Sequence, residues 1–208
     1  MSITEKINHG LDIVGAEWVM WLLIVMSVMT LACIIERWRF LLTRRIDMDK
    51  TWAFLAKALD GENKAEVETR LSDANAMEEV VALKVLQERG KSVEALEDIA
   101  QAAVEMEKLK YNQRLGFLAT TASNAPFIGL LGTVVGIVEA FAKLADAAPG
   151  QSRSTLIMGS ISEALAATAI GLLVAIPAAA AYNWLQGKVD ECESRSMILT
   201  KQVVARLR

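Results

Sequence analysis

Three polar side chains lie inside otherwise apolar stretches of the chain and could do chemistry there. Thr133 lies in the run 125–142, and Glu163 and Thr168 lie in the run 156–185. Within a membrane, a carboxylate can take up and release a proton, and a hydroxyl can supply a dipole to a passing charge. These residue types favour a polar path for an ion or a proton between two closely packed membrane helices.

The two threonines are predicted to lie at the same depth. Thr133 is ten residues from Lys143, and Thr168 is ten residues from Met158, if these mark the edges of the outer loop. Ten helical residues rise about 15 Å, which is half the hydrocarbon thickness. Two hydroxyls near the midplane predict a polar ring when the helices repeat around an axis. A single threonine could instead bond to a carbonyl of its own helix.

Glu163 lies on a different face of its helix. It is about 140° from Thr168 at about 100° per residue, so it is predicted to face a seam between helices. An intramembrane carboxylate is costly unless it is protonated or paired, and a functional role is the first hypothesis. The alternative is a neutral carboxyl, or one paired with a neighbouring chain. Away from the ends of the predicted spans, the sequence offers no Lys or Arg as an intramembrane partner.

Small residues recur at steps of three and four along both runs, so they share one face of each helix. They are Gly129, Gly132, Gly136, Ser160, Ala164 and Gly171. Such faces allow close approach of membrane helices, either between subunits or within one subunit. Pro126 and Pro177 each remove one backbone hydrogen bond and predict local kinks.

Composition places the chain in the membrane class. Hydrophobic residues make up 53% of its 208 residues, and the mean hydropathy is +0.32. The net charge of −3 gives no basis for nucleic-acid binding. Cys33 and Cys192 lie in unlike surroundings and predict no disulfide framework, and His9 has no nearby ligand partners. We therefore expect no metal and no cofactor.

The pattern predicts an all-α membrane protein with three transmembrane helices and long cytoplasmic helical extensions. The predicted parts are a periplasmic segment (1–17), transmembrane helix 1 (18–42), a cytoplasmic helical domain (43–114), transmembrane helix 2 (115–143), a periplasmic loop (144–155), transmembrane helix 3 (156–185) and a cytoplasmic tail (186–208). Five basic residues follow the first apolar run and only Lys6 precedes it, which puts the N-terminus outside and the C-terminus in the cytoplasm. Because the basic residues follow the run, a cleaved secretory signal is disfavoured.

The predicted cytoplasmic domain carries helix signals but no catalytic spacing. Gly61 and Gly90 are predicted breaks, and Ser92 is a predicted N-cap for a helix that begins at Val93. A helical stripe is predicted along that helix at Leu96, Ile99, Ala103, Met106 and Leu109 or Lys110. We interpret the domain as a helical unit that packs on itself and on neighbours.

Two long motifs resemble a known family. The run APFIGLLGTVVGI at 125–137, followed by Phe141, is similar to the second-helix motif of the MotA/TolQ/ExbB proton-channel family. The run SISEALAATAIGLLVAIPAAAAYN at 160–183 is similar to its third-helix motif, and Glu36-Arg37 fits the end of its first helix. The length and the three spans favour the ExbB/TolQ branch.

The resemblance implies a subunit of the bacterial inner membrane that forms a homo-oligomer, a pentamer, around two copies of a single-span ExbD/TolR-type partner. In that family, the partner's membrane Asp carries the proton, and the motor drives a TonB- or TolA-like protein. Thr133 and Thr168 match the threonines that line the path, and Glu163 matches the family's third-helix glutamate. The resemblance leaves open nutrient uptake, envelope maintenance and a surface-motility motor.

Two other classes of function would make different demands on the sequence. A passive membrane scaffold for a cytoplasmic signalling domain would tolerate apolar replacements of the polar membrane residues. An intramembrane enzyme would need a Ser–His pair or paired aspartates at depth. No His or Asp lies within the predicted spans, so we expect no enzymatic activity.

Overall fold

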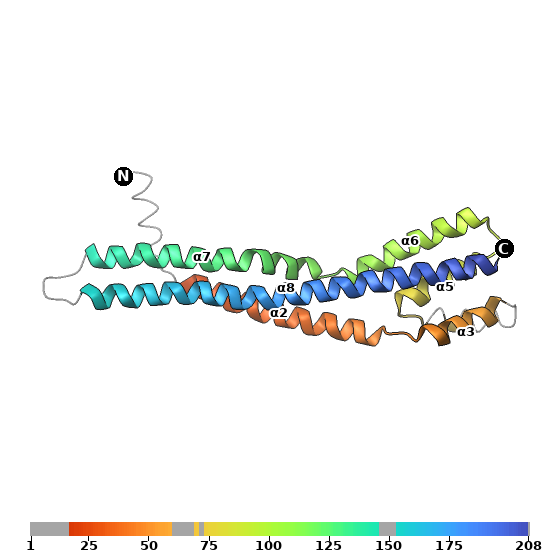
Figure 1. The fold of residues 1–208 in the computed structure, drawn as a ribbon, viewed down its shortest axis with the longest axis horizontal. Helices are drawn as coiled ribbons and strands as arrows, with labels where there is room; N and C mark the ends of the chain where they lie inside the picture. Colours follow the sequence, from red (N-terminus) through yellow and green to blue (C-terminus); the bar gives the residue numbers. More distant parts are fainter. Residues whose placement is uncertain (1–16, 60–68, 71–72, 146–152, 208) are drawn as a thin grey trace. The chain divides into compact units, whose positions relative to one another are not determined.

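The computed structural model describes residues 17–59, 69–70, 73–145 and 153–207 (Figure 1). The predicted segment 1–17, apart from Glu17, and the centre of the predicted loop 144–155 lie outside the described residues. His9 and the predicted break at Gly61 lie outside them as well.

Three long helices carry the apolar runs: α2 (Glu17–Thr43), α7 (Leu115–Ala145) and α8 (Arg153–Arg206). Each is long and apolar enough to cross a membrane. Between α2 and α7 in the sequence lie the shorter helices α3 (Met48–Leu59), α5 (Met77–Gln87) and α6 (Val93–Tyr111). The described residues form no β-strand. The prediction of an all-α protein with three potential spans is thus confirmed.

The helices group into two compact units. The membrane unit comprises the described residues up to Ile35 together with Gly116–Tyr182. The polar unit comprises Glu36–Leu115 and Asn183–Arg208, as far as they are described. The helix α8 contributes its first part to the membrane unit and its second part to the polar unit, and it continues as one helix through Pro177 (Figure 1).

The core of the membrane unit is formed where α2, α7 and α8 meet. Its buried members are Val19, Leu23, Ala125, Val174 and Ala175. Large apolar side chains lie on the outside of the same helices, where Phe127 is 68% exposed and Leu173 is 72% exposed. Such an outer surface suits lipid or neighbouring membrane helices, because neither requires a polar exterior.

The core of the polar unit is built from larger side chains. Met77, Val81 and Leu83 of α5 are fully buried, and Leu96 of α6, which contacts α5, is 2% exposed. Between the two helices, Gly90 adopts a φ of +104°, a left-handed conformation that glycine accepts readily. The predicted break at this position is thus confirmed.

The helix α6 begins as predicted but buries a different face. The Ser92 side chain caps it by accepting a hydrogen bond from the Ala95 N–H at 3.3 Å. The predicted helical stripe is wrong at its C-terminal end, because Met106 and Leu109 are exposed whereas Glu107 and Tyr111 are buried. Both sets of residues follow steps of three and four, so the spacing alone does not identify the face that a neighbouring helix covers. Its members are Leu96, Ala100, Ala103, Val104, Glu107 and Tyr111.

Candidate functional site

The helices α7 and α8 approach each other most closely at two glycines. A Cβ atom at Gly171 would lie 2.7 Å from the Ala125 carbonyl oxygen and 3.1 Å from the Gly129 Cα. A Cβ atom at Gly129 would lie 2.8 Å from the Ala167 carbonyl oxygen. The atoms that it would meet are backbone atoms, so the two helix backbones are in direct contact and leave no room for a side chain.

Two further glycines extend this contact along α7. A Cβ atom at Gly136 would lie 2.7 Å from the Cβ of Ala164, and one at Gly132 would lie 2.7 Å from the Cβ of Ala167. The same atom at Gly132 would lie 3.1 Å from Val19 of α2. The structure therefore brings the small residues of α7 and α8 together within a single chain.

The two threonines lie beside this contact and make different hydrogen bonds. The half-buried Thr168 donates its hydroxyl across the helix pair to the Gly129 carbonyl oxygen, at 3.1 Å. Thr133 is 8% exposed and donates to the Leu130 carbonyl oxygen of its own helix, at 2.6 Å. Since Gly132 lies against Ala167, the rise per residue puts the two threonines within about 3 Å of each other in height.

These bonds decide which polar atoms remain available. Each hydroxyl hydrogen is engaged by a backbone carbonyl, so the threonine oxygens are left as hydrogen-bond acceptors. The described spans carry no His or Asp near them. The threonine pair can therefore accept a hydrogen bond from a proton-bearing group, but it contains no group that titrates near neutral pH.

Glu163 lies apart from the threonines, toward the end of the helix pair at which α7 ends and α8 begins. Its side chain is exposed, and it makes no hydrogen bond or ion pair with another described residue. Its charge acts on Lys143, at the end of α7. The Lys143 Nζ also lies 2.8 Å from Glu139 Oε1 and donates to the hydroxyl of the buried Ser160, at 3.5 Å.

Sequence reasoning missed Glu139 and two further polar residues in the membrane unit. The Glu139–Lys143 pair could have been found from its four-residue spacing on one helix. Thr30 of α2 and Thr121 of α7 are 2% and 1% exposed, and their hydroxyls have no hydrogen-bond partner among the described residues. Their sequence context gives no such signal, because burial depends on the packing of three helices.

The Glu36-Arg37 motif has a structural role in the polar unit. Arg37 is 4% exposed and donates to Glu36 Oε2 at 2.9 Å and to the Lys110 carbonyl oxygen at 3.2 Å. Arg114 lies 3.0 Å from the same Glu36 oxygen and has a φ of +63° in the turn between α6 and α7. The motif thus ties the end of α2 to the turn that precedes α7.

Comparisons with known proteins agree on one family. The model of the family described as "MotA/TolQ/ExbB proton channel family" matches residues 63–197. The chain is 49% identical over 89 residues to the Tol-Pal system protein TolQ of Haemophilus influenzae, which covers 43% of this chain and 37% of that protein. It is 44% identical over 103 residues to the biopolymer transport protein ExbB of Aquifex aeolicus, which covers 50% of this chain and 65% of that protein.

A third relative is similar over a shorter stretch. The putative biopolymer transport protein ExbB-like 2 of Helicobacter pylori (strain ATCC 700392 / 26695) is 48% identical over 83 residues, or 40% of this chain and 54% of that protein. The chain therefore spans less than two thirds of the length of each of these relatives.

Proposed function

The chain belongs to the MotA/TolQ/ExbB proton channel family, and from that premise we propose that it is a subunit of a motor driven by the proton-motive force. Its three potential spans and its ExbB and TolQ relatives make it a multi-pass protein of the inner membrane. In this proposal it couples proton passage to mechanical work on a partner, as the ExbB/TolQ branch implies.

The observation that carries the proposal is the threonine pair beside the closest contact of α7 and α8. Thr168 and Thr133 present acceptor oxygens deep in an apolar unit, yet neither can carry a proton at neutral pH. Glu163 lies apart from this pair, so a proton carrier beside the threonines would come from another chain. A carboxyl group on a single-span ExbD/TolR-type partner fits this need. One charge that crosses 100 mV releases about 2.3 kcal/mol, enough to bias one step of the motor.

The assembly follows from the family resemblance. Five copies of the chain surround two copies of the partner, with Thr133 and Thr168 toward the central path. The basic residues after the first span support a periplasmic N-terminus and a cytoplasmic C-terminus. The motor drives a TonB- or TolA-like protein, and the relatives named for biopolymer transport and for the Tol-Pal system support this direction. Glu163 acts at the outer end of the path.

The test replaces one hydroxyl at a time by a methyl group of the same shape. Thr168→Val and Thr133→Val are purified with the partner, reconstituted into liposomes, and assayed for proton flux under an imposed potential. We expect flux to fall about tenfold, because one hydrogen bond of about 1.4 kcal/mol is lost from the path. Thr120→Val is the matched control, since Thr120 is an exposed threonine of α7, the helix that carries Thr133. Unchanged flux in both variants would contradict a proton path along the threonine pair.

A further inference from the structure

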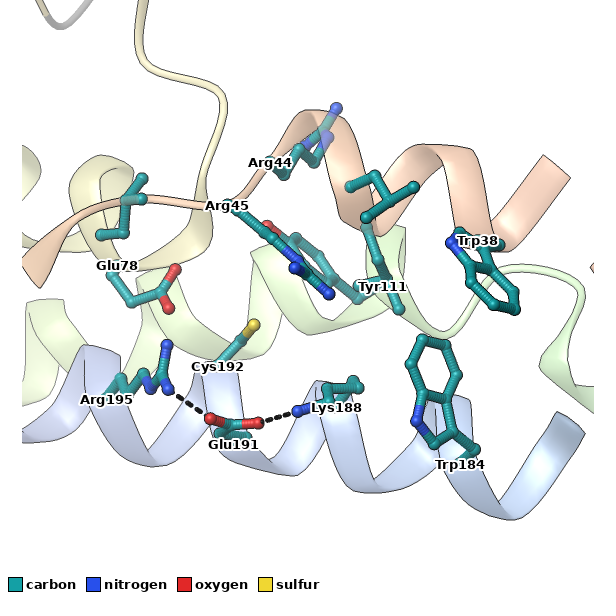
Figure 2. Close-up of a pocket in the computed structure, with 13 residues that line it drawn as sticks. Trp38, Arg44, Arg45, Glu78, Tyr111, Trp184, Lys188, Glu191, Cys192 and Arg195 are labelled. Carbon is teal, nitrogen blue, oxygen red and sulfur yellow. Dashed lines mark hydrogen bonds and ion pairs between the residues drawn. The ribbon is translucent and has the colours of Figure 1, made fainter. Parts of the chain in front are cut away.

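The polar unit contains a cavity of about 280 Å³ whose lining is rich in charge (Figure 2). Its walls come from the end of α2 and the residues after it, from α5, from α6 and from the second part of α8. The charged side chains of the lining are Arg44, Arg45, Lys188, Arg195, Glu78 and Glu191. With four basic and two acidic groups, the lining has an excess of positive charge.

Most of these cations are already paired. Lys188 Nζ lies 2.6 Å from Glu191 Oε2, and Arg195 binds the other oxygen of the same carboxylate. Arg44 donates to the Asn75 carbonyl oxygen at 2.8 Å. Arg45 differs from them, because it makes no hydrogen bond or ion pair with another described residue and its side chain is exposed. Its charge acts on the Glu191 carboxylate of the same lining. The cavity therefore offers one guanidinium group whose N–H donors have no acceptor among the described residues.

The cavity also offers one uncommitted acceptor. Glu78 is 2% exposed, and its Oε2 has no hydrogen-bond partner among the described residues. Cys192 also lines the cavity, and Figure 2 shows its thiol beside the Glu78 carboxyl. A buried carboxyl oxygen without a donor is costly. The site therefore calls for a ligand with an N–H or O–H group as well as a negative charge.

The opposite end of the cavity is aromatic (Figure 2). The rings of Trp38 and Trp184 are 5.4 Å apart, and the two residues are 51% and 41% exposed. In the sequence, Trp38 follows the apolar run of α2 and Trp184 lies at the end of the apolar run of α8. Tryptophans at such positions prefer the level of the lipid headgroups. From one end of the cavity to the other, the lining thus changes from aromatic residues typical of the membrane interface to charged residues.

We propose that this cavity binds the headgroup of a membrane phospholipid, with the phosphate on Arg45 and an N–H or O–H donor of the headgroup on Glu78 Oε2. The ammonium of an ethanolamine headgroup and the hydroxyls of a glycerol headgroup supply that donor. A choline headgroup has the phosphate but no donor. Inorganic phosphate lacks the donor-bearing substituent and would leave the tryptophan end without a ligand. An acidic peptide would not require the interfacial aromatic pair.

The experiment measures lipid retention by the delipidated full-length chain in detergent. The protein is offered equal amounts of phosphatidylethanolamine, phosphatidylglycerol and phosphatidylcholine with the same acyl chains, and bound lipids are counted by native mass spectrometry. We expect the first two lipids to exceed phosphatidylcholine about tenfold, as one charge-assisted hydrogen bond predicts. Equal retention of all three lipids by the wild-type chain would overturn the proposal.

Three variants assign the binding to this cavity. Arg45→Gln should bind phosphatidylethanolamine and phosphatidylglycerol about tenfold more weakly, through loss of a charged contact to phosphate. Glu78→Leu should bind the three lipids alike, because the acceptor for the headgroup donor is gone. The matched control is Arg39→Gln, since Arg39 is an exposed arginine of α2 that does not line the cavity. Arg45 is exposed and makes no hydrogen bond or ion pair with another described residue, so we expect Arg45→Gln to fold. Wild-type retention in Arg45→Gln would overturn the proposal.

Two competition arms distinguish the other sources of the same chemistry. Phosphoethanolamine or inorganic phosphate at millimolar concentration should not displace the lipid, and full displacement would identify a soluble phosphate ester as the ligand. A bound protein or peptide mass that excludes the lipid would identify a macromolecular partner instead. Neither result depends on proton flux, so this proposal and the proposed motor function can fail separately.

Discussion

The membrane unit and the polar unit fill their interiors in opposite ways. In the membrane unit, Gly129 and Gly171 bring two helix backbones into contact, and the large apolar side chains lie outside. In the polar unit, Met77 and Leu83 fill the core, and charged side chains lie outside. Lipid gives no reason to bury large apolar side chains, so close backbone packing stabilises one unit. Water gives that reason, so side-chain burial stabilises the other.

The stability of the two units should therefore be sensitive to opposite changes in side-chain size. One added carbon should disturb the membrane unit, because the nearest atoms are backbone atoms that cannot rotate away. Removal of carbons should disturb the polar unit, because it leaves a cavity. Large side chains on the surface of either unit should tolerate truncation.

The largest expected effect is that of Leu83→Ala in α5. Leu83 is fully buried, and its truncation should lower the free energy of unfolding of the polar unit by about 2–5 kcal/mol. Leu109→Ala is the matched control, because the same change occurs at a side chain that is 72% exposed. Thermal unfolding followed by tryptophan fluorescence in detergent would measure both. A similar shift in the two variants would contradict the described core.

A smaller effect is expected for Gly171→Ala in α8. The new Cβ would lie 2.7 Å from the Ala125 carbonyl oxygen, and such overpacking typically costs about 1–3 kcal/mol. Gly159→Ala on the same helix is the control, because its Cβ would meet no atom within 4 Å. There the better helix propensity of alanine should make the change neutral or slightly stabilising. If Gly171→Ala and Gly159→Ala changed the unfolding temperature in the same direction, the close backbone packing described at Gly171 would be contradicted.

The smallest expected effect concerns Glu78 and depends on pH. Desolvation by burial raises the pKa of the Glu78 carboxyl above its ordinary value of 4.5. Folding then favours the protonated form, so this contribution to stability is full below pH 4.5 and is lost as pH rises through the folded-state pKa. Glu78→Gln removes the titration. Relative to the wild-type chain in lipid-free detergent, the variant should gain stability between pH 4 and pH 8, and a constant difference across this range would exclude the shift.

Local signals in the sequence predicted several elements of the fold. Ser92 has the side chain of a helix cap and Gly90 the conformational freedom of a break, and both act within a few residues. The apolar runs predicted three potential spans because the length of a membrane helix is fixed by the bilayer. The buried face of α6 was missed at Met106 and Leu109, since hydrophobicity alone does not identify the face that a neighbouring helix covers.

The candidate site could also be predicted only in part, because local signals are visible in the sequence and packing is not. The types and spacing of Thr133 and Thr168 are visible in the sequence, whereas the acceptor of each hydroxyl is set by packing. The open oxygen of Glu78 beside Cys192 arises from α5 and α8, which are far apart in the sequence. No spacing rule connects such residues. Whether Glu163 works in proton passage stays a prediction.

The engaged hydroxyls of Thr133 and Thr168 have one more consequence, for the two charge states of a visiting carboxyl group. While both bonds to Leu130 and Gly129 hold, the oxygens can receive a hydrogen but cannot give one. A neutral carboxylic acid would be solvated there, and a bare carboxylate would not. The helix pair would thereby act as a filter that admits the loaded form of a carrier and turns back the empty one.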